Sequence, residues 1–238
     1  MTSATPFSTT ADVAAESFAG QLRLSTAAEW DASVHHRFVD QLFAGTVSDQ
    51  VLARYLVQDY QFFDAFIAML GACVATTDSK PARLRFAAQL GMLAADEDGY
   101  FRQTFTELGV PDSEVTSPES ATPTTDFVTQ MWEVAQSRDY ADLLVVLVIA
   151  EWLYLDWGER DLPLPEAPKH RGWIELHRGD EFRAWTQFLI DELNRVAPPL
   201  ESDDGARLSE RWKRVVGIER AFFDAAYSSV PLGPLAGG

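Results

Sequence analysis

Hydrophobic side chains recur every three or four positions along almost the whole chain, and strict alternation of hydrophobic and polar residues is nearly absent. This spacing gathers apolar side chains on one face of an α-helix. The expected helices cover residues 26–44, 48–77, 80–108, 127–137, 140–161, 173–196 and 208–227. The pattern therefore predicts an all-α bundle of about seven helices, and a ligand site in such a bundle lies between facing helices.

Proline, serine, threonine and glycine gather in the segments between these helices. The main expected loops cover residues 111–126, 162–170 and 197–205. Such composition is typical of surface connections. Neither flank of the longest loop could form an independent core, so we expect one domain over residues 25–228. Residues 1–24 are expected to be a flexible lead-in and residues 229–238 a flexible tail.

Charge and composition narrow the range of partners. The 238 residues include 36 acidic and 19 basic side chains, a net charge of -17. So acidic a chain repels phosphate backbones and anionic headgroups, which argues against nucleic acid and membranes as partners. The longest apolar run, residues 143–150, is far shorter than the ~20 residues of a membrane-spanning helix. We also expect no signal peptide. The single cysteine, Cys73, excludes an internal disulfide and favours a cytoplasmic setting.

Three acids interrupt helix faces that are otherwise apolar and aromatic. Asp59 shares a face with Phe62 and Phe66, Glu151 follows eight apolar residues, and Glu219 lies among valines and phenylalanines. An unpaired carboxylate costs several kcal/mol to bury, so each acid requires an explanation. A single acid of this kind is more often half of a structural ion pair. Three together favour an aromatic pocket for a flat, basic, nitrogen-rich ligand, in which crowded carboxylates could act as acid and base.

Metal and cysteine chemistry have little support in the sequence. His35 and His36 are adjacent on a helix and point about 100° apart, so they cannot chelate one metal together. No histidine forms the HxxE or ExxH pairs of a carboxylate metal site, and no glycine-rich phosphate loop occurs. Cys73 has no histidine nearby in sequence to activate it and reads as a core thiol. We therefore expect no metal and no cofactor.

Several motifs occur in a characteristic order. The segment HHRFVDQLFAGTVSDQVLARYLVQDYQFFDAF is followed by IAEWLYLDWGER, IELHRGDEFRAWTQFLIDELN and the closing IERAFFDAAY. In the first segment the pattern H-x-F, G-T, Y and Q-D-x-x-[YF] is filled by His36, Phe38, Gly45, Thr46, Tyr55, Gln58, Asp59 and Phe62. Taken together, the motifs span residues 26–227 and resemble the TenA (thiaminase II) family.

The resemblance implies a heme-oxygenase-like helical bundle, usually a homotetramer, with a pocket for the aminopyrimidine half of thiamin. Asp59 matches the acid that binds the amino edge of the pyrimidine, and Phe62 matches the stacking aromatic. Tyr154 matches a pocket tyrosine and Glu219 the general acid/base. The resemblance also brings Phe127 and His177 near pocket positions that are commonly tyrosine.

One position departs from the cysteine-containing branch of the family. That branch carries a nucleophilic cysteine four residues before the mid-chain tyrosine, where this chain has Ala150; Glu151 follows it, as in the cysteine-free branch. The resemblance thus implies hydrolysis of a formylamino- or aminomethyl-pyrimidine in thiamin salvage, with Asp59, Glu151 and Glu219 as catalytic residues. The alternatives are a non-catalytic pyrimidine-binding or regulatory protein, or another enzyme on the same bundle.

Overall fold

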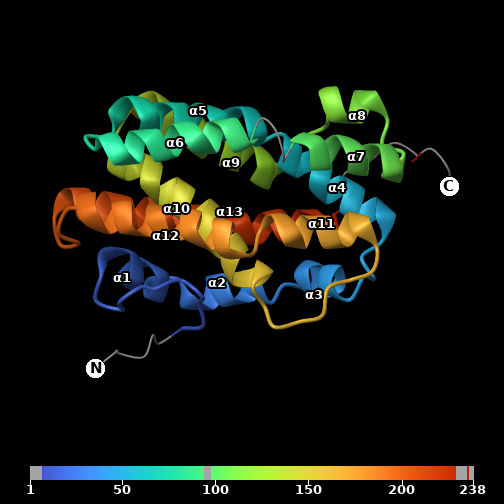
Figure 1. Ribbon diagram of the computed structural model, residues 1–238, viewed down its shortest axis with the longest axis horizontal. Helices are drawn as coiled ribbons and strands as arrows, with labels where there is room; N and C mark the ends of the chain where they lie inside the picture. The colour runs from blue at the N-terminus through green and yellow to red at the C-terminus, as the bar shows by residue number, and fades with distance from the viewer. Residues whose placement is uncertain (1–6, 94–97, 229–234, 236–238) are drawn as a thin grey trace.

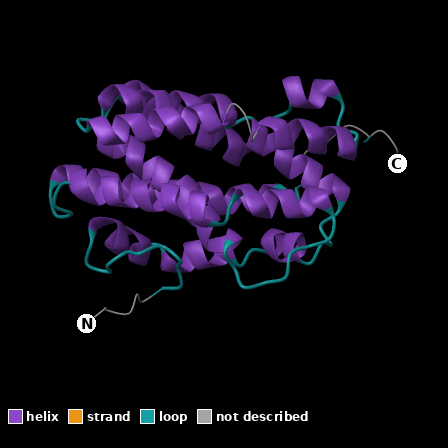
Figure 2. Cartoon of the chain, viewed as in Figure 1, coloured by secondary structure: helices purple, strands orange, loops and turns teal. Residues whose placement is uncertain are grey.

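The computed structural model describes residues 7–93, 98–228 and 235. The described residues form helices and loops without a strand, which confirms the all-α prediction (Figure 2). The helices are α1 (Phe18–Ser25), α2 (Ala27–Val34), α3 (Arg37–Phe43), α4 (Asp49–Tyr60), α5 (Phe63–Thr76), α6 (Lys80–Met92), α7 (Asp98–Leu108), α8 (Asp112–Thr116), α9 (Thr122–Ser137), α10 (Tyr140–Gly158), α11 (Pro168–Leu176), α12 (Asp180–Val196) and α13 (Asp203–Ala225).

The described part of the chain thus holds thirteen helices rather than about seven, because several expected helices are broken. The expected helix over residues 48–77 is interrupted between α4 and α5. There the N–H of Phe62 donates to the carbonyl of Asp59, three residues back, at 2.9 Å. Such bonds tighten a helix end into a 3₁₀-like turn and redirect the chain. The expected helix over residues 80–108 includes residues 94–97, which lie outside the described residues.

A second break divides the helix expected over residues 173–196. Gly179 has φ +89°, a conformation that side-chain-bearing residues rarely adopt, and it separates α11 from α12. In the loop expected over residues 162–170, α11 starts early at Pro168, the first helical position, where proline loses no hydrogen bond. Likewise the loop expected over residues 111–126 contains α8 and the start of α9.

The N-terminal segment differs from the expected flexible lead-in. Phe7, Ala11 and Val13 are buried, and α1 follows with Ser17 as its N-cap. Three long-range hydrogen bonds connect the segment to α12: Asn194 accepts from the N–H of Ala19 at 2.9 Å, and the Gln187 amide accepts from the N–H of Asp12 and donates to its carbonyl. The ordered domain therefore begins before residue 25. The expected tail, residues 229–238, lies outside the described residues except for Leu235.

Figure 1 shows the helices in three layers, with α5, α6 and α9 in one, α11, α12 and α13 in the next, and α1, α2 and α3 in the last. Helix α10 crosses these layers and packs against α2, α5, α9, α12 and α13. Residues 143–149 of α10 are fully buried, as expected for a helix that is apolar on every side. Among the described helices, none combines the length and the apolar character that a bilayer crossing requires.

Candidate functional site

A cavity of about 570 Å³ is lined by residues of α4, α5, α6, α7, α9, α10, α11, α12 and α13. All seven site residues expected from the sequence line it: Asp59, Phe62, Phe127, Glu151, Tyr154, His177 and Glu219. The three acids come from α4, α10 and α13, which are far apart in the chain. The volume is within the range of pockets that hold small organic ligands.

Glu219 is the most deeply buried acid of the cavity. Its side chain is 0% exposed, and neither carboxyl oxygen has a hydrogen-bond partner among the described residues. Burial, with a smaller contribution from the charge of Asp59, raises the pKa of Glu219 well above its usual range. The protonated form of this carboxyl group, which lines the cavity, is therefore favoured.

Asp59 reaches the cavity because its neighbour Gln58 fixes the end of α4. The buried Gln58 amide accepts hydrogen bonds from the N–H of Ala121 at 2.8 Å and the Thr124 hydroxyl at 2.7 Å. It also donates to the carbonyl of Glu119 at 2.8 Å. These bonds hold the loop before α9 against α4. Gln58 therefore has a structural role, whereas Asp59 belongs to the site. The half-buried Asp59 lines the cavity.

Glu151 is oriented by a tryptophan from α12. The indole N–H of Trp185 donates to Glu151 Oε1 at 2.8 Å, and both side chains are buried. A buried indole N–H needs an acceptor, and here the acceptor is a pocket acid. The hydrogen bond fixes one oxygen of the carboxyl group and thereby its direction relative to the cavity.

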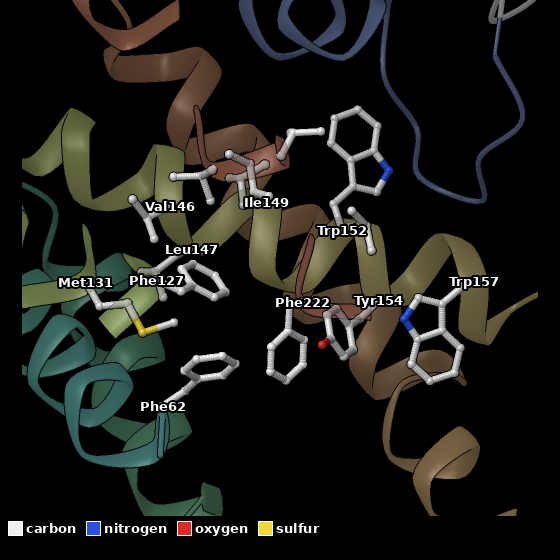
Figure 3. Packing of buried hydrophobic residues seen from close by; sticks show 14 of the residues in the cluster. Phe62, Phe127, Met131, Val146, Leu147, Ile149, Trp152, Tyr154, Trp157 and Phe222 are labelled. Carbon is white, nitrogen blue, oxygen red and sulfur yellow. The ribbon is translucent and has the colours of Figure 1, made fainter. Parts of the chain in front are cut away.

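Aromatic rings lie beside the acids, and Phe62 and Phe127 line the cavity. Phe62 packs edge-on against Phe127 with ring centroids 5.0 Å apart, and it lies 4.9 Å from Phe222. Figure 3 shows these three rings turned toward one another, with Tyr154 beside Phe222. Flat faces and edges of this kind suit a planar heteroaromatic ring.

Tyr154 and His177 close the wall next to α11. The hydroxyl of Tyr154 is 2.9 Å from that of Tyr55, and burial raises the pKa of both phenols well above the usual range. His177 Nδ1 is 2.8 Å from the carbonyl oxygen of Trp173, which can only accept, so this nitrogen carries the proton. Burial lowers the pKa of His177 to about 4. The ring is therefore neutral at physiological pH, with Nε2 left as an acceptor.

Comparison with known proteins identifies the family. The sequence profile of the TENA/THI-4/PQQC family matches residues 25–229. The chain belongs to the TENA/THI-4/PQQC family. The expected resemblance to TenA proteins is thereby confirmed at the level of the family.

Named relatives of this TENA/THI-4/PQQC protein include two bacterial enzymes. The aminopyrimidine aminohydrolase of Halalkalibacterium halodurans is 25% identical, over 89% of this chain and 96% of the relative. The enzyme of the same name from Bacillus subtilis is 26% identical, over 88% of this chain and 89% of the relative. Both alignments span nearly the whole of each protein.

Solved structures agree on the fold. A TenA homologue from Pyrococcus furiosus superimposes with a TM-score of 0.79 at 20% identity, covering 88% of this chain and all of the other. A TenA family transcription regulator from a Silicibacter species gives a TM-score of 0.77 at 22% identity, covering 91% of this chain and 97% of the other. The bundle is the helical heme-oxygenase-like fold, as expected from the sequence.

The position at which the family resemblance places a nucleophilic cysteine is occupied by alanine in this TENA/THI-4/PQQC protein. Ala150 lines the cavity at the position expected for the nucleophile. Cys73 lies two helical turns beyond Phe66 on α5, fully buried, and is not among the described residues that line the cavity. Burial raises the pKa of the Cys73 thiol far above its usual value, which disfavours the reactive thiolate.

Several polar residues that line the cavity were not predicted from the sequence, and they include Trp185, Arg178, Arg85, Gln89, Glu175, Asp180 and Glu181. Trp185 is a buried core residue, and its acceptor on α10 follows only from the packing of α12 against that helix. Arg178 sits in a turn that was expected to be helical. No group of three or more histidine, cysteine or acidic side chains among the described residues could hold a metal ion.

Proposed function

We propose that this protein is a hydrolase that acts on aminopyrimidine breakdown products of thiamin, and that it works without a catalytic cysteine. The observation that carries the proposal is the meeting of Asp59, Glu151 and Glu219 in one aromatic cavity. The names of the relatives from Halalkalibacterium halodurans and Bacillus subtilis, both aminopyrimidine aminohydrolases, support the same substrate class. Ala150 at the nucleophile position supports the cysteine-free branch.

Binding would use the acids and the rings together. The pyrimidine ring stacks on Phe62 and meets the edge of Phe127, and Asp59 accepts hydrogen bonds from the amino edge of the ring. His177 and Tyr154 contribute an acceptor and a hydroxyl at the same wall. A pocket of this composition fixes the orientation of a flat basic ligand with few polar groups.

Hydrolysis then requires one proton donor and one base. Glu219 donates a proton to a ring nitrogen, which draws electrons away from the exocyclic methylene carbon. Glu151 removes a proton from water, the oxygen of the water bonds to the methylene carbon, and the carbon–nitrogen bond breaks. The departing amine takes up the proton from Glu151, the ring nitrogen returns its proton to Glu219, and the products are ammonia and the hydroxymethyl-pyrimidine. General acid and base catalysis of this kind contributes typically ~10²–10⁴-fold each.

The test is product release from an aminomethyl-pyrimidine by the purified protein, compared with the Cys73→Ser variant. We expect turnover in the wild type and equal turnover in the variant, because Cys73 is buried outside the cavity. An alkylating reagent should leave the rate unchanged. A protein that binds the pyrimidine without turnover would instead be a binding or regulatory protein. Loss of activity in Cys73→Ser, with the fold retained, would contradict the cysteine-free mechanism.

Two further expectations from the sequence stay predictions. The family resemblance implies a homotetramer, which is a prediction about contacts between copies of the chain. The cytoplasmic setting rests on the single cysteine of the sequence.

A further inference from the structure

Arg178 occupies a fixed turn at the edge of the cavity. On one side its neighbour His177 is held by its ring hydrogen bond to Trp173 and by the close approach of Gly158. On the other side the N–H of Gly179 donates to Glu159 Oε1 at 2.8 Å. The backbone of Arg178 is therefore anchored at both flanks, and its side chain lines the cavity.

The guanidinium group of Arg178 lacks a full set of protein partners. Its Nη1 atom is buried and has no hydrogen-bond partner among the described residues. A buried charged donor without an acceptor is costly, and arginine is suited to binding planar oxygen-bearing groups. Arg183, five residues further on, differs in this respect, because it pairs with Asp180 and Glu159. The open donor of Arg178 thus indicates an acceptor that a ligand supplies.

Arg178 and Glu151 line the same cavity, and this limits which group of a ligand accepts the hydrogen bond from Arg178. Glu151 is held by Trp185 of α12, Arg178 lies in the turn that precedes this helix, and both residues line the cavity. Phe62, the proposed stacking residue, lines the same cavity, so a substituent on the aminomethyl nitrogen of a stacked pyrimidine would share the cavity with both residues. The cavity, at about 570 Å³, has room for more than a single ring.

We propose that Arg178 binds the carbonyl oxygen of an N-acyl group, such as formyl, on the aminomethyl nitrogen of the pyrimidine. In this way Arg178 selects acylated substrates over free amines. This inference rests on the proposed function for the location of the ring. In the acylated substrate, water held by Glu151 adds to the carbonyl carbon and Arg178 stabilises the oxyanion. The carbon–nitrogen bond then breaks, the amine nitrogen receives a proton, and formate leaves. The step needs water alone as co-reactant.

Arg178 has the opposite effect on the binding of the free amine. An aminomethyl group is cationic at neutral pH, so a nearby guanidinium repels it. Removing the charge of Arg178 should therefore weaken binding of the formylated pyrimidine and leave binding of the aminomethyl-pyrimidine unchanged or tighter. A merely structural role of Arg178 would weaken both ligands alike.

The experiment is calorimetric titration of both pyrimidines into the wild type, Arg178→Gln, Arg178→Lys and the control Lys213→Gln. Lys213 pairs with Glu210 on the surface of α13, so its variant changes the net charge equally away from the cavity. We expect Kd for the formylated ligand to rise about 10- to 100-fold in Arg178→Gln and less in Arg178→Lys, with no change in Lys213→Gln.

Equal Kd changes for the two pyrimidines, or none, in both Arg178 variants would overturn the inference. Arg178→Lys keeps the charge and serves if Arg178→Gln fails to fold. Because Kd does not depend on turnover, a selective loss of formylated-ligand binding supports the role of Arg178 even in a protein that hydrolyses neither compound. In that case the proposed hydrolase function fails while this inference stands.

Discussion

Glu219 and Glu151 are the same residue type in one cavity, but their surroundings differ. Glu219 has no hydrogen-bond donor among the described residues, and burial raises its pKa. Glu151 accepts a hydrogen bond from an indole N–H. The first environment favours a proton donor, and the second fixes the direction of a carboxyl group. Two glutamates with different environments can divide the acid and base roles of one reaction.

Removing the indole donor tests the role of Trp185. In Trp185→Phe we expect kcat to fall about tenfold with little change in KM, because the ring is kept and Glu151 loses its hydrogen bond. Steady-state kinetics measures this. Trp212→Phe is the matched control, since its indole donates to Thr26 at 2.9 Å outside the cavity. Unchanged kcat in Trp185→Phe would contradict the positioning role.

Residue patterns in the sequence revealed the acids but not their neighbours. An acid on an apolar face is costly, so Asp59, Glu151 and Glu219 could be recognised from local spacing alone. Trp185 and Arg178 carry no such local signal, because a tryptophan on a helix face is usually a core residue. Their roles depend on which helix lies opposite, which is set by long-range packing.

At the scale of the elements, the breaks between helices position the site. The turn after α4 redirects Phe62 against Phe127, and the turn at Gly179 brings His177 and Arg178 to the cavity wall. The sequence predicted continuous helices at both places, because hydrophobic spacing continues across each break. Gly179 was a local signal of the second break. The first break followed no glycine or proline.

A substitution at Gly158 tests how closely α10 must approach the turn after α11. A Cβ atom there would lie 2.1 Å from the carbonyl oxygen of His177. We expect Gly158→Ala to lower the free energy of unfolding by about 1–3 kcal/mol through overpacking, measured by urea denaturation. Gly217 of α13 has open space around it, so Gly217→Ala should instead raise that free energy by about 0.4–1 kcal/mol. Equal effects of the two substitutions would refute the close approach.

At the scale of the whole molecule, a buried polar cluster attaches the N-terminal segment to α10. Thr9 donates to Asp156 at 2.6 Å, and the indole N–H groups of Trp30 and Trp152 donate to Asp156 at 2.9 Å and to Thr9 at 2.8 Å. Arg23 lies 3.8 Å from Asp156 and is fully buried. Residues 1–24 were predicted to be a flexible lead-in, whereas these contacts attach the segment to the bundle.

Asp156 should make stability depend on pH. Burial raises its pKa from 3.8 to about 7. Between these values the folded state holds a proton that the unfolded state has released, so stability is greatest below pH 4 and falls as pH rises toward 7. Relative to Asp156→Asn, the wild type should lose up to about 4 kcal/mol over this window. Urea denaturation at several pH values measures the difference. A wild type that keeps or gains stability relative to Asp156→Asn as pH rises from 4 to 7 would contradict the assignment.

We propose that Asp59, Glu151 and Glu219 act together on one aminopyrimidine. Rates of hydrolysis and calorimetric binding, measured in three variants, test this directly. Glu219→Gln keeps shape and hydrogen bonding but removes proton transfer, so turnover should fall ~10²–10⁴-fold while binding survives. Glu151→Gln should also lose most of its rate. Asp59→Ala should weaken binding by about 1.5–3 kcal/mol. Wild-type rates in both glutamine variants would contradict the claim and leave a protein that binds pyrimidines without catalysis.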